Sequence, residues 1–199
     1  MITLVLGGAR SGKSSFAQQI AWQRGGYDVI YLATALSGDE EMAARIKDHR
    51  QNRPIEWKTI EEPLQVSKIF SALPPGQVVV LDCLTILISN ILLREAEAGP
   101  TDFDFAAAGN EKEVFLEIEM MLKHSREKKL DLIMVSNEVG QSLVPTYRLG
   151  RLYRDVVGRA NQLLAGVAGQ VYLLYAGLPV EIKELAQKHL EQYHNGGDE

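Results

Sequence analysis

The sequence predicts an α/β domain in which a mostly parallel sheet is flanked by helices. Short apolar runs alternate along the chain with longer amphipathic stretches, which is typical of strands and crossover helices around a parallel sheet. The first apolar run ends in a glycine-rich turn that opens a helical stretch, as in nucleotide-binding units. The 199 residues suffice for one compact domain over 1–199, and we expect its polar tail, 190–199, to fray.

Composition and charge exclude several classes of protein. Hydrophobic residues make up 46% of the chain and charged residues 24%, which is ordinary for a soluble globular protein. The 21 basic and 26 acidic residues give a net charge of −5 without a basic block, so we expect no nucleic-acid partner. Cys83 is the single cysteine, which excludes an intrachain disulfide and favours a reducing compartment. The sequence has neither a basic leader nor an apolar run of the ~18 residues that a membrane helix needs, so we expect a cytoplasmic protein that spans no membrane.

The first elements form a strand–helix–strand unit. Residues 2–6 are apolar and predict a buried strand that ends at the glycines. Residues 14–24 carry apolar side chains at helical spacing, and two glycines end that helix. Residues 29–33 predict a second strand. Residues 39–52 predict a charged helix whose acidic start and basic end match the helix dipole, with a proline just beyond it.

The middle of the chain continues the alternation. Residues 55–60 alternate apolar and polar side chains and predict a half-buried strand. Residues 63–73 predict a helix, and a Pro-Pro-Gly turn follows it. Residues 78–81 are the most strand-like run in the chain, and this run ends in Asp82.

The last elements repeat the pattern with longer helices. We expect helices over 84–97 and 105–128, separated by a Gly-Pro loop. A buried strand over 132–136 follows, then a long helix over 147–168 with an apolar stripe, and a strand over 171–175.

The turn after the first strand matches G-x-x-x-x-G-K-[ST], the pattern of a phosphate-binding loop. Its residues are Gly7, Gly8, Ala9, Arg10, Ser11, Gly12, Lys13 and Ser14. Glycines let backbone N–H groups curl around phosphate oxygens, and the following helix N-terminus adds partial positive charge. Lys13 is expected to bridge the terminal phosphates, and the Ser14 hydroxyl to bind Mg²⁺. The alternative, a chance match on a structural turn, arises on the order of once in a hundred chains of this length.

Asp82 is the candidate for a second Mg²⁺ ligand. A carboxylate after four buried apolar residues lies at the carboxyl edge of a parallel sheet, where such folds bind ligands. Without the phosphate loop, Asp82 would be interpreted as an ordinary strand-ending aspartate. The guanine-reading motif of signalling GTPases, Asn/Thr-Lys-x-Asp, is absent from the sequence, which argues against a switch GTPase.

His49 lies at the basic end of the charged helix predicted over 39–52. A histidine in such a place is most often a solvated surface residue. Near a phosphate site, however, it could act as a base or as a nucleophile that forms a phosphoramidate. The flanking Arg50 and Arg53 favour the nucleophile, since they could bind the phosphates of the group under attack.

Four charged residues on the long helix are spaced by three and four positions and therefore share one face. They are Arg148, Arg151, Asp155 and Arg159. This pattern is compatible with salt bridges on a solvated surface, each worth about 0.3–0.5 kcal/mol. It is equally compatible with a stripe that binds anions or faces another subunit.

Taken together, these motifs resemble the bifunctional adenosylcobinamide kinase/adenosylcobinamide-phosphate guanylyltransferases of cobalamin biosynthesis. The resemblance spans residues 2–183. It rests on 7–14, Tyr-Leu-Ala-Thr-Ala at 31–35, Met-Ala-Ala-Arg-Ile at 42–46, His49, Arg53-Pro54, Trp57, Thr59, Glu61, Asn-Glu-Val-Gly at 137–140, Val144-Pro145, Arg154-Asp155, Gly158 and Asn161-Gln162.

The resemblance implies two reactions in sequence. The first phosphorylates adenosylcobinamide with a nucleoside triphosphate, ATP or GTP. The second transfers GMP from GTP to that phosphate through a guanylylated histidine, which falls on His49, and gives adenosylcobinamide-GDP. Some relatives have a histidine where this chain has Asp48, and others have a glutamate at the position of Asp82.

The resemblance also implies the site and the assembly. Nucleotide contacts fall on residues 7–14, Thr34, Arg50, Gln51, Asn52, Arg53, Glu61 and Asp82, and Mg²⁺ on Ser14 and Asp82. The implied fold is a recombinase-like P-loop domain that forms a homotrimer, with the corrinoid near subunit interfaces. Two alternatives remain at this point: a P-loop kinase of another small metabolite with a structural His49, and a nucleotide-dependent assembly or recombination ATPase.

Overall fold

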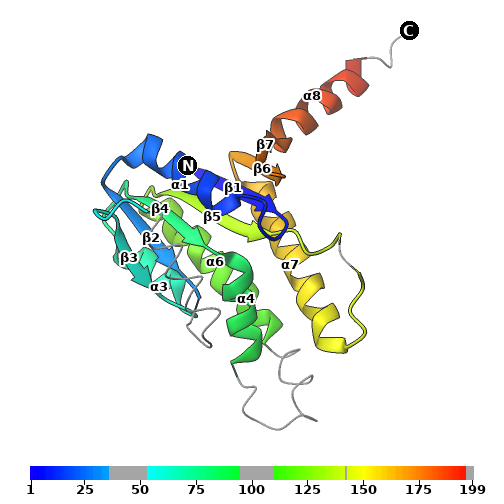
Figure 1. Ribbon diagram of the computed structural model, residues 1–199, viewed down its shortest axis with the longest axis horizontal. Helices are drawn as coiled ribbons and strands as arrows, with labels where there is room; N and C mark the ends of the chain where they lie inside the picture. The colour runs from blue at the N-terminus through cyan, green and yellow to red at the C-terminus, as the bar shows by residue number, and fades with distance from the viewer. Residues whose placement is uncertain (36–52, 95–109, 142, 196–199) are drawn as a thin grey trace.

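A computed structural model describes residues 1–35, 53–94, 110–141 and 143–195, and their side chains up to residue 188. Its centre is a seven-stranded sheet in the order β3-β2-β4-β5-β1-β6-β7 (Figure 1). The strands are β1 (Ile2–Gly7), β2 (Val29–Ala33), β3 (Lys58–Glu61), β4 (Val78–Asp82), β5 (Asp131–Asn137), β6 (Gln170–Tyr175) and β7 (Leu178–Glu181). All neighbouring strands pair in parallel except β7, which is antiparallel to β6. The carboxyl ends of six strands therefore share one edge of the sheet.

Helices cover the two faces of the sheet unequally. They are α1 (Lys13–Gly25), α3 (Val66–Ala72), α4 (Leu84–Leu93), α6 (Glu111–Glu127), α7 (Arg148–Val167) and α8 (Ile182–Asn195). Helix α1 packs on one face through Ala17, Ile20 and Ala21. Helices α3, α4, α6 and α7 pack on the other face (Figure 1). None of the helices in the described ranges combines the length and apolar character that crossing a membrane requires.

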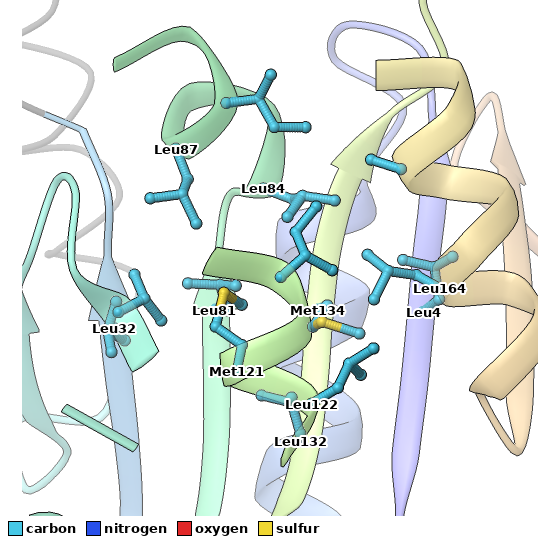
Figure 2. Packing of buried hydrophobic residues seen from close by; sticks show 14 of the residues in the cluster. Leu4, Leu32, Leu81, Leu84, Leu87, Met121, Leu122, Leu132, Met134 and Leu164 are labelled. Atoms are coloured by element: carbon cyan, nitrogen blue, oxygen red, sulfur yellow. The ribbon is translucent and has the colours of Figure 1, made fainter. Parts of the chain in front are cut away.

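The larger half of the core lies between the sheet and these four helices. Figure 2 shows strand residues and helix residues interleaved in this layer. The labelled side chains are Leu4, Leu32, Leu81, Leu132 and Met134 from the strands and Leu84, Leu87, Met121, Leu122 and Leu164 from the helices. Their burial, at about 25 cal/mol per Å² of apolar surface, fixes the strands and thereby the loops at their carboxyl ends.

Arg24 ties together the opposite, amino-terminal edge of the sheet. Its Nη1 donates to Thr3 Oγ1 at 3.0 Å and to Asp131 Oδ1 at 2.9 Å, and its Nη2 donates to Gln170 Oε1 at 2.7 Å. These three partners lie on β1, β5 and β6. One guanidinium thus holds the strand that leads into the phosphate loop against both of its neighbours.

Most elements expected from the sequence are confirmed. The predicted strands 2–6, 29–33, 78–81, 132–136 and 171–175 correspond to β1, β2, β4, β5 and β6, each within one residue at either end. Helices expected over 14–24, 63–73, 84–97, 105–128 and 147–168 correspond to α1, α3, α4, α6 and α7. The helix expected over 39–52 lies outside the described residues, as do parts of those expected over 84–97 and 105–128.

Three features differ from the expectation. The strand predicted over 55–60 begins only at Lys58, because Ile55 is 95% exposed and does not join the alternating pattern. The hairpin strand β7 and helix α8 were not predicted. Helix α8 extends away from the sheet and runs to Asn195, within the stretch 190–199 where we expected fraying (Figure 1).

Candidate active site

The phosphate loop connects the end of β1 to the start of α1, at the edge where the parallel strands end. Gly12 has φ +90° and Arg10 φ +56°, so the chain turns twice through left-handed conformations, which glycine adopts without a steric penalty. A Cβ added at Gly7 would lie 2.5 Å from Ser11 Oγ and 2.8 Å from the Leu174 carbonyl oxygen. Glycine is thus required at Gly7 by close packing and at Gly12 by backbone conformation.

Lys13 lies inside this loop. Its Nζ donates to the Gly8 carbonyl oxygen at 2.7 Å, and its side chain is largely buried. Burial lowers the pKa of Lys13 from its usual 10.5, and the negative charge of nearby Asp82 opposes that shift. The ammonium group is therefore held at the centre of the loop, where a bound phosphate would lie.

Ser11 forms the inner wall of the loop. Its Oγ is buried and has no hydrogen-bond partner among the described residues. Its carbonyl oxygen accepts a hydrogen bond from the Gly177 N–H at 3.1 Å, so the β6–β7 turn packs directly on the loop. A buried hydroxyl without a partner is costly in an apolar site and suits a loop built to surround an anion.

Asp82 ends β4 and lies on the same face of the sheet as α1. Val80 belongs to the core cluster on the α1 side, and Asp82, two residues further along the strand, points the same way. The Tyr31 hydroxyl donates to Asp82 Oδ2. The predicted metal ligands Ser14 and Asp82 are thus both placed on the α1 side of the carboxyl edge.

This donor set fits Mg²⁺. A serine hydroxyl and one carboxylate are hard oxygen ligands, and Mg²⁺ is normally held by one or two such groups together with water and substrate phosphates. Within the described residues there is no cluster of three or more His, Cys, Asp or Glu side chains that could hold a metal by itself. One hydroxyl and one carboxylate leave the other coordination positions to water and phosphate oxygens, so this pair suits a magnesium ion that arrives with a nucleotide.

Thr34 connects the ends of β2 and β4. Its Oγ1 donates to the Cys83 carbonyl oxygen at 2.8 Å and accepts from the Cys83 N–H at 3.0 Å. Its own N–H donates to the Asp82 carbonyl oxygen at 3.1 Å. Thr34 is fully buried, so the structure gives it a direct part in fixing the chain beside Asp82.

Arg53 lies over the ring of Tyr31, with its Cζ 3.4 Å from the ring centroid. Burial first, and the charge of Asp82 second, raise the pKa of Tyr31 well above its usual 10.0, although Arg53 opposes this. The phenol therefore stays protonated and remains a hydrogen-bond donor to Asp82. Arg53 is thus linked to Asp82 through Tyr31, by a stacked contact on one side and a hydrogen bond on the other. The charge of Asp82 in turn acts on Lys13 of the phosphate loop.

The remaining predicted residues are distributed unevenly. Glu61 ends β3 opposite Ala33 and is exposed, on the same edge as the phosphate loop but separated from β1 by three strands. His49 lies outside the described residues, as do Asp48, Arg50, Gln51 and Asn52. The structure thus brings residues 7–14, Thr34, Arg53 and Asp82 together.

Reasoning from the residues missed Tyr31 and gave Asn137 no role. Asn137 ends β5, and its Nδ2 donates to Thr85 Oγ1 at 3.0 Å, while Asn161 Nδ2 donates to the Asn137 carbonyl oxygen at 3.1 Å. Asn137 could have been found as a polar residue at the end of a buried strand, as Asp82 was. Tyr31 could have been found as a phenol in an apolar strand, because a buried hydroxyl requires a hydrogen-bond partner.

The charged face of α7 makes contacts within the chain. Arg159 pairs with Glu111 of α6 at 2.8 Å, and Arg151 Nη1 donates to the carbonyl oxygens of Pro145 at 3.1 Å and Thr146 at 2.7 Å. These partners lie on a neighbouring helix and on the loop before α7. These contacts of Arg151 and Arg159 are therefore not salt bridges to residues three or four positions away on the same helix.

Cys83 is expected to resist alkylation in the folded protein. Burial first, and the charge of Asp82 second, raise the pKa of its thiol from 9.0 to about 11. At about pH 8 the thiolate fraction is then on the order of one in a thousand, against about one in ten in the unfolded chain. Iodoacetamide labelling followed by mass spectrometry should be at least about 100-fold slower in native buffer than in concentrated guanidinium. Equal rates in both would show that the thiol is not buried as described.

Several known proteins are similar to this chain in sequence. The family model described as cobinamide kinase / cobinamide phosphate guanyltransferase matches residues 3–182. The chain is 38% identical over 185 residues to the bifunctional adenosylcobalamin biosynthesis protein CobU of Escherichia coli (strain K12), across 92% of this chain and 100% of that protein. It is 38% identical, with the same coverage, to CobU of Salmonella typhimurium. It is 39% identical to the bifunctional adenosylcobalamin biosynthesis protein CobP of Pseudomonas aeruginosa, across 92% and 98% of the two chains.

A solved structure shares the fold. An ATPase from the type III secretion system of pathogenic bacteria has a TM-score of 0.54 at 12% sequence identity, over 94% of this chain and 54% of that chain. The predicted fold class, an α/β domain with a mostly parallel sheet flanked by helices, is confirmed.

Proposed function

Since the chain belongs to the cobinamide kinase / cobinamide phosphate guanyltransferase family, we propose that both reactions use the site at the carboxyl edge of its sheet. The chain is a bifunctional transferase of adenosylcobalamin biosynthesis. The observation that carries the assignment of the site is the convergence of the phosphate loop, Asp82 and Arg53 on the α1 side of that edge.

In the kinase step, the chain positions a nucleoside triphosphate and stabilises charge. The N–H groups of residues 7–14 surround the β- and γ-phosphates. Lys13 neutralises the negative charge that develops on the phosphate oxygens during the transfer. The aminopropanol hydroxyl of adenosylcobinamide attacks the γ-phosphorus and forms a new O–P bond. The bond between the γ-phosphorus and the bridging oxygen of the β-phosphate breaks, and the nucleoside diphosphate leaves. Ser14 and Asp82 would hold Mg²⁺, which would supply neutralising charge to the phosphates.

The guanylyl step uses a protein nucleophile. Neutral His49 attacks the α-phosphorus of GTP, so that an N–P bond forms and pyrophosphate leaves. The phosphate of adenosylcobinamide phosphate then displaces GMP from the histidine and yields adenosylcobinamide-GDP. Lys13 and the loop N–H groups stabilise the departing pyrophosphate, and Arg50 and Arg53 bind phosphate oxygens beside His49. Gln51, Asn52 and Glu61 complete the proposed nucleotide contacts, whereas the fully buried Thr34, also expected among these contacts, would instead hold the chain beside Asp82.

We further propose that the protein works in the cytoplasm as a homotrimer. Two reactions on a bulky corrinoid share one nucleotide site in a domain of 199 residues. A neighbouring subunit would then supply part of the wall of the substrate site.

The guanylyl step is tested by covalent labelling. We incubate the protein with α-labelled GTP and Mg²⁺, denature it, and expect an acid-labile, alkali-stable label on the chain, as a phosphoramidate requires. His49→Ala should abolish the label and retain phosphorylation of cobinamide, because the kinase step needs no protein nucleophile. The matched control is His124→Ala, since His124 lies on α6 and pairs with Glu127 at 3.0 Å.

Each other outcome has a definite meaning. An unlabelled wild-type protein would overturn the guanylyl half of the proposal and favour a kinase with a structural His49. A label that survives in His49→Ala would place the nucleophile elsewhere. Nucleotide hydrolysis without phosphorylation of cobinamide would favour an assembly ATPase, which the family match disfavours.

A further inference from the structure

We propose that Tyr31 is a positioning residue that holds Asp82 and Arg53 in register around one magnesium-bound nucleotide. The inference rests on the proposed function, because it assigns Asp82 to the metal and Arg53 to the nucleotide. The Tyr31 hydroxyl would set the magnesium dependence of nucleotide binding, and the Tyr31 ring would set the affinity for the nucleotide itself.

The hydroxyl of Tyr31 fixes the orientation of the Asp82 carboxylate. Tyr31 lies on β2, fully buried, and its hydroxyl donates to Asp82 Oδ2 across the β2–β4 pair. In this pair Tyr31 is opposite Val80, and Ala33 is opposite Asp82. The Tyr31 side chain therefore reaches diagonally to Asp82, two residues beyond its own partner and on the same face of the sheet. A carboxylate held through one oxygen keeps its other oxygen in a fixed direction, and outer-shell partners of this kind typically change metal affinity about 10- to 100-fold.

The ring of Tyr31 supports the guanidinium of Arg53. The 3.4 Å separation between Arg53 Cζ and the ring centroid is that of a stacked pair. A guanidinium lying flat on a ring directs its N–H groups sideways within its own plane, as bidentate binding of a phosphate requires. Arg53 follows Arg50 by three positions and His49 by four in the sequence.

The surroundings of Tyr31 do not account for its hydroxyl as a packing group. The core cluster on this side of the sheet consists mainly of aliphatic side chains from β1, β2, β4, β5 and α1. A phenylalanine would fill the same volume and avoid the desolvation of a phenol. A tyrosine with only a structural role would therefore stabilise the fold without affecting magnesium or nucleotide binding.

The test measures binding rather than turnover. A non-hydrolysable ATP analogue is titrated calorimetrically into the wild type and its variants, at a series of Mg²⁺ concentrations. Tyr31→Phe keeps the ring and removes the hydroxyl, so the Mg²⁺ concentration for half-maximal binding should rise about tenfold, with affinity at saturating Mg²⁺ within twofold. Tyr31→Leu also removes the ring and should weaken affinity at saturating Mg²⁺ by about 3- to 30-fold.

Tyr153→Phe is the matched control. Tyr153 is another tyrosine that is partly buried, and its hydroxyl donates to the Thr85 carbonyl oxygen at 3.3 Å. It lies on α7, which packs on the opposite face of the sheet from Tyr31. Both of its binding parameters should stay within twofold of the wild type, and thermal melts should confirm that each variant is folded.

The outcomes separate the inference from the proposed function. Wild-type magnesium dependence in Tyr31→Phe, or equal affinities for the leucine and phenylalanine variants at saturating Mg²⁺, would overturn the inference alone. Failure of the wild type to bind the analogue would instead overturn the proposed function. If Tyr31→Leu does not fold, Arg53→Lys replaces it: this variant keeps the charge, loses the planar stack and should show the same loss of affinity.

Discussion

Replacement of Lys13 by alanine is expected to slow the phosphorylation of cobinamide by on the order of 10²–10³-fold. The Lys13 ammonium is held inside the phosphate loop by the Gly8 carbonyl oxygen at 2.7 Å. Removing it leaves the charge that develops during phosphoryl transfer without the cation that the loop supplies. Steady-state assays with saturating nucleotide and cobinamide measure the change, and the loss should appear mainly in kcat.

Lys68→Ala is the control for this variant. Lys68 lies exposed on α3, its Nζ donates to Gln65 Oε1 at 2.6 Å, and among the described residues no side-chain hydrogen bond or ion pair joins it to the candidate site. Its removal should leave the rate within twofold of the wild type. Phosphorylation by Lys13→Ala at close to the wild-type rate would refute the assignment of residues 7–14 as the phosphate loop.

Replacement of Phe70 by alanine is expected to lower the free energy of unfolding by about 3–5 kcal/mol. Phe70 lies on α3, is fully buried, and belongs to the larger core cluster between the sheet and the four helices. Truncation removes a large apolar side chain and leaves a cavity that neighbouring side chains fill only in part. Urea denaturation followed by circular dichroism measures the change as a shift of the midpoint with little change in slope.

Leu116→Ala gives the comparison for Phe70. Leu116 lies on α6 and is 58% exposed, so its truncation should cost less than about 1 kcal/mol. A loss for Phe70→Ala as small as that for Leu116→Ala would show that α3 does not pack on the sheet as described.

The first strand, loop and helix could be predicted from the sequence because their signals are local. An apolar run, a glycine-rich turn and an amphipathic stretch follow one another without interruption in residues 2–25. The β6–β7 hairpin lacks such signals. Its turn places Ala176 at φ +51° and Gly177 at φ +83°, and alanine is not the residue that predicts a turn of this kind. Strand β7 is also short and mostly exposed, and it contains a proline.

The site shows the same division between local and distant information. The position of Asp82 at the carboxyl edge could be predicted because it follows four buried apolar residues of one strand, and this edge is where parallel sheets bind ligands. The role of Tyr31 could not be predicted, because it depends on the pairing of β2 with β4, whose contacting residues Tyr31 and Asp82 are 51 positions apart. Only the register of these strands brings the phenol to the carboxylate.

Strand β5 lies between β1 and β4, so the strand that leads into the phosphate loop and the strand that ends in Asp82 are two interstrand spacings apart, about 9–10 Å. A triphosphate anchored at the loop would extend across the end of β5 toward the carboxylate, with its phosphorus atoms at successive points along that path. Attack on the outermost phosphorus and attack on the innermost one would then need no second anchor. One bound nucleotide would offer two points of bond cleavage, and the approaching nucleophile, rather than the grip on the nucleotide, would select between them.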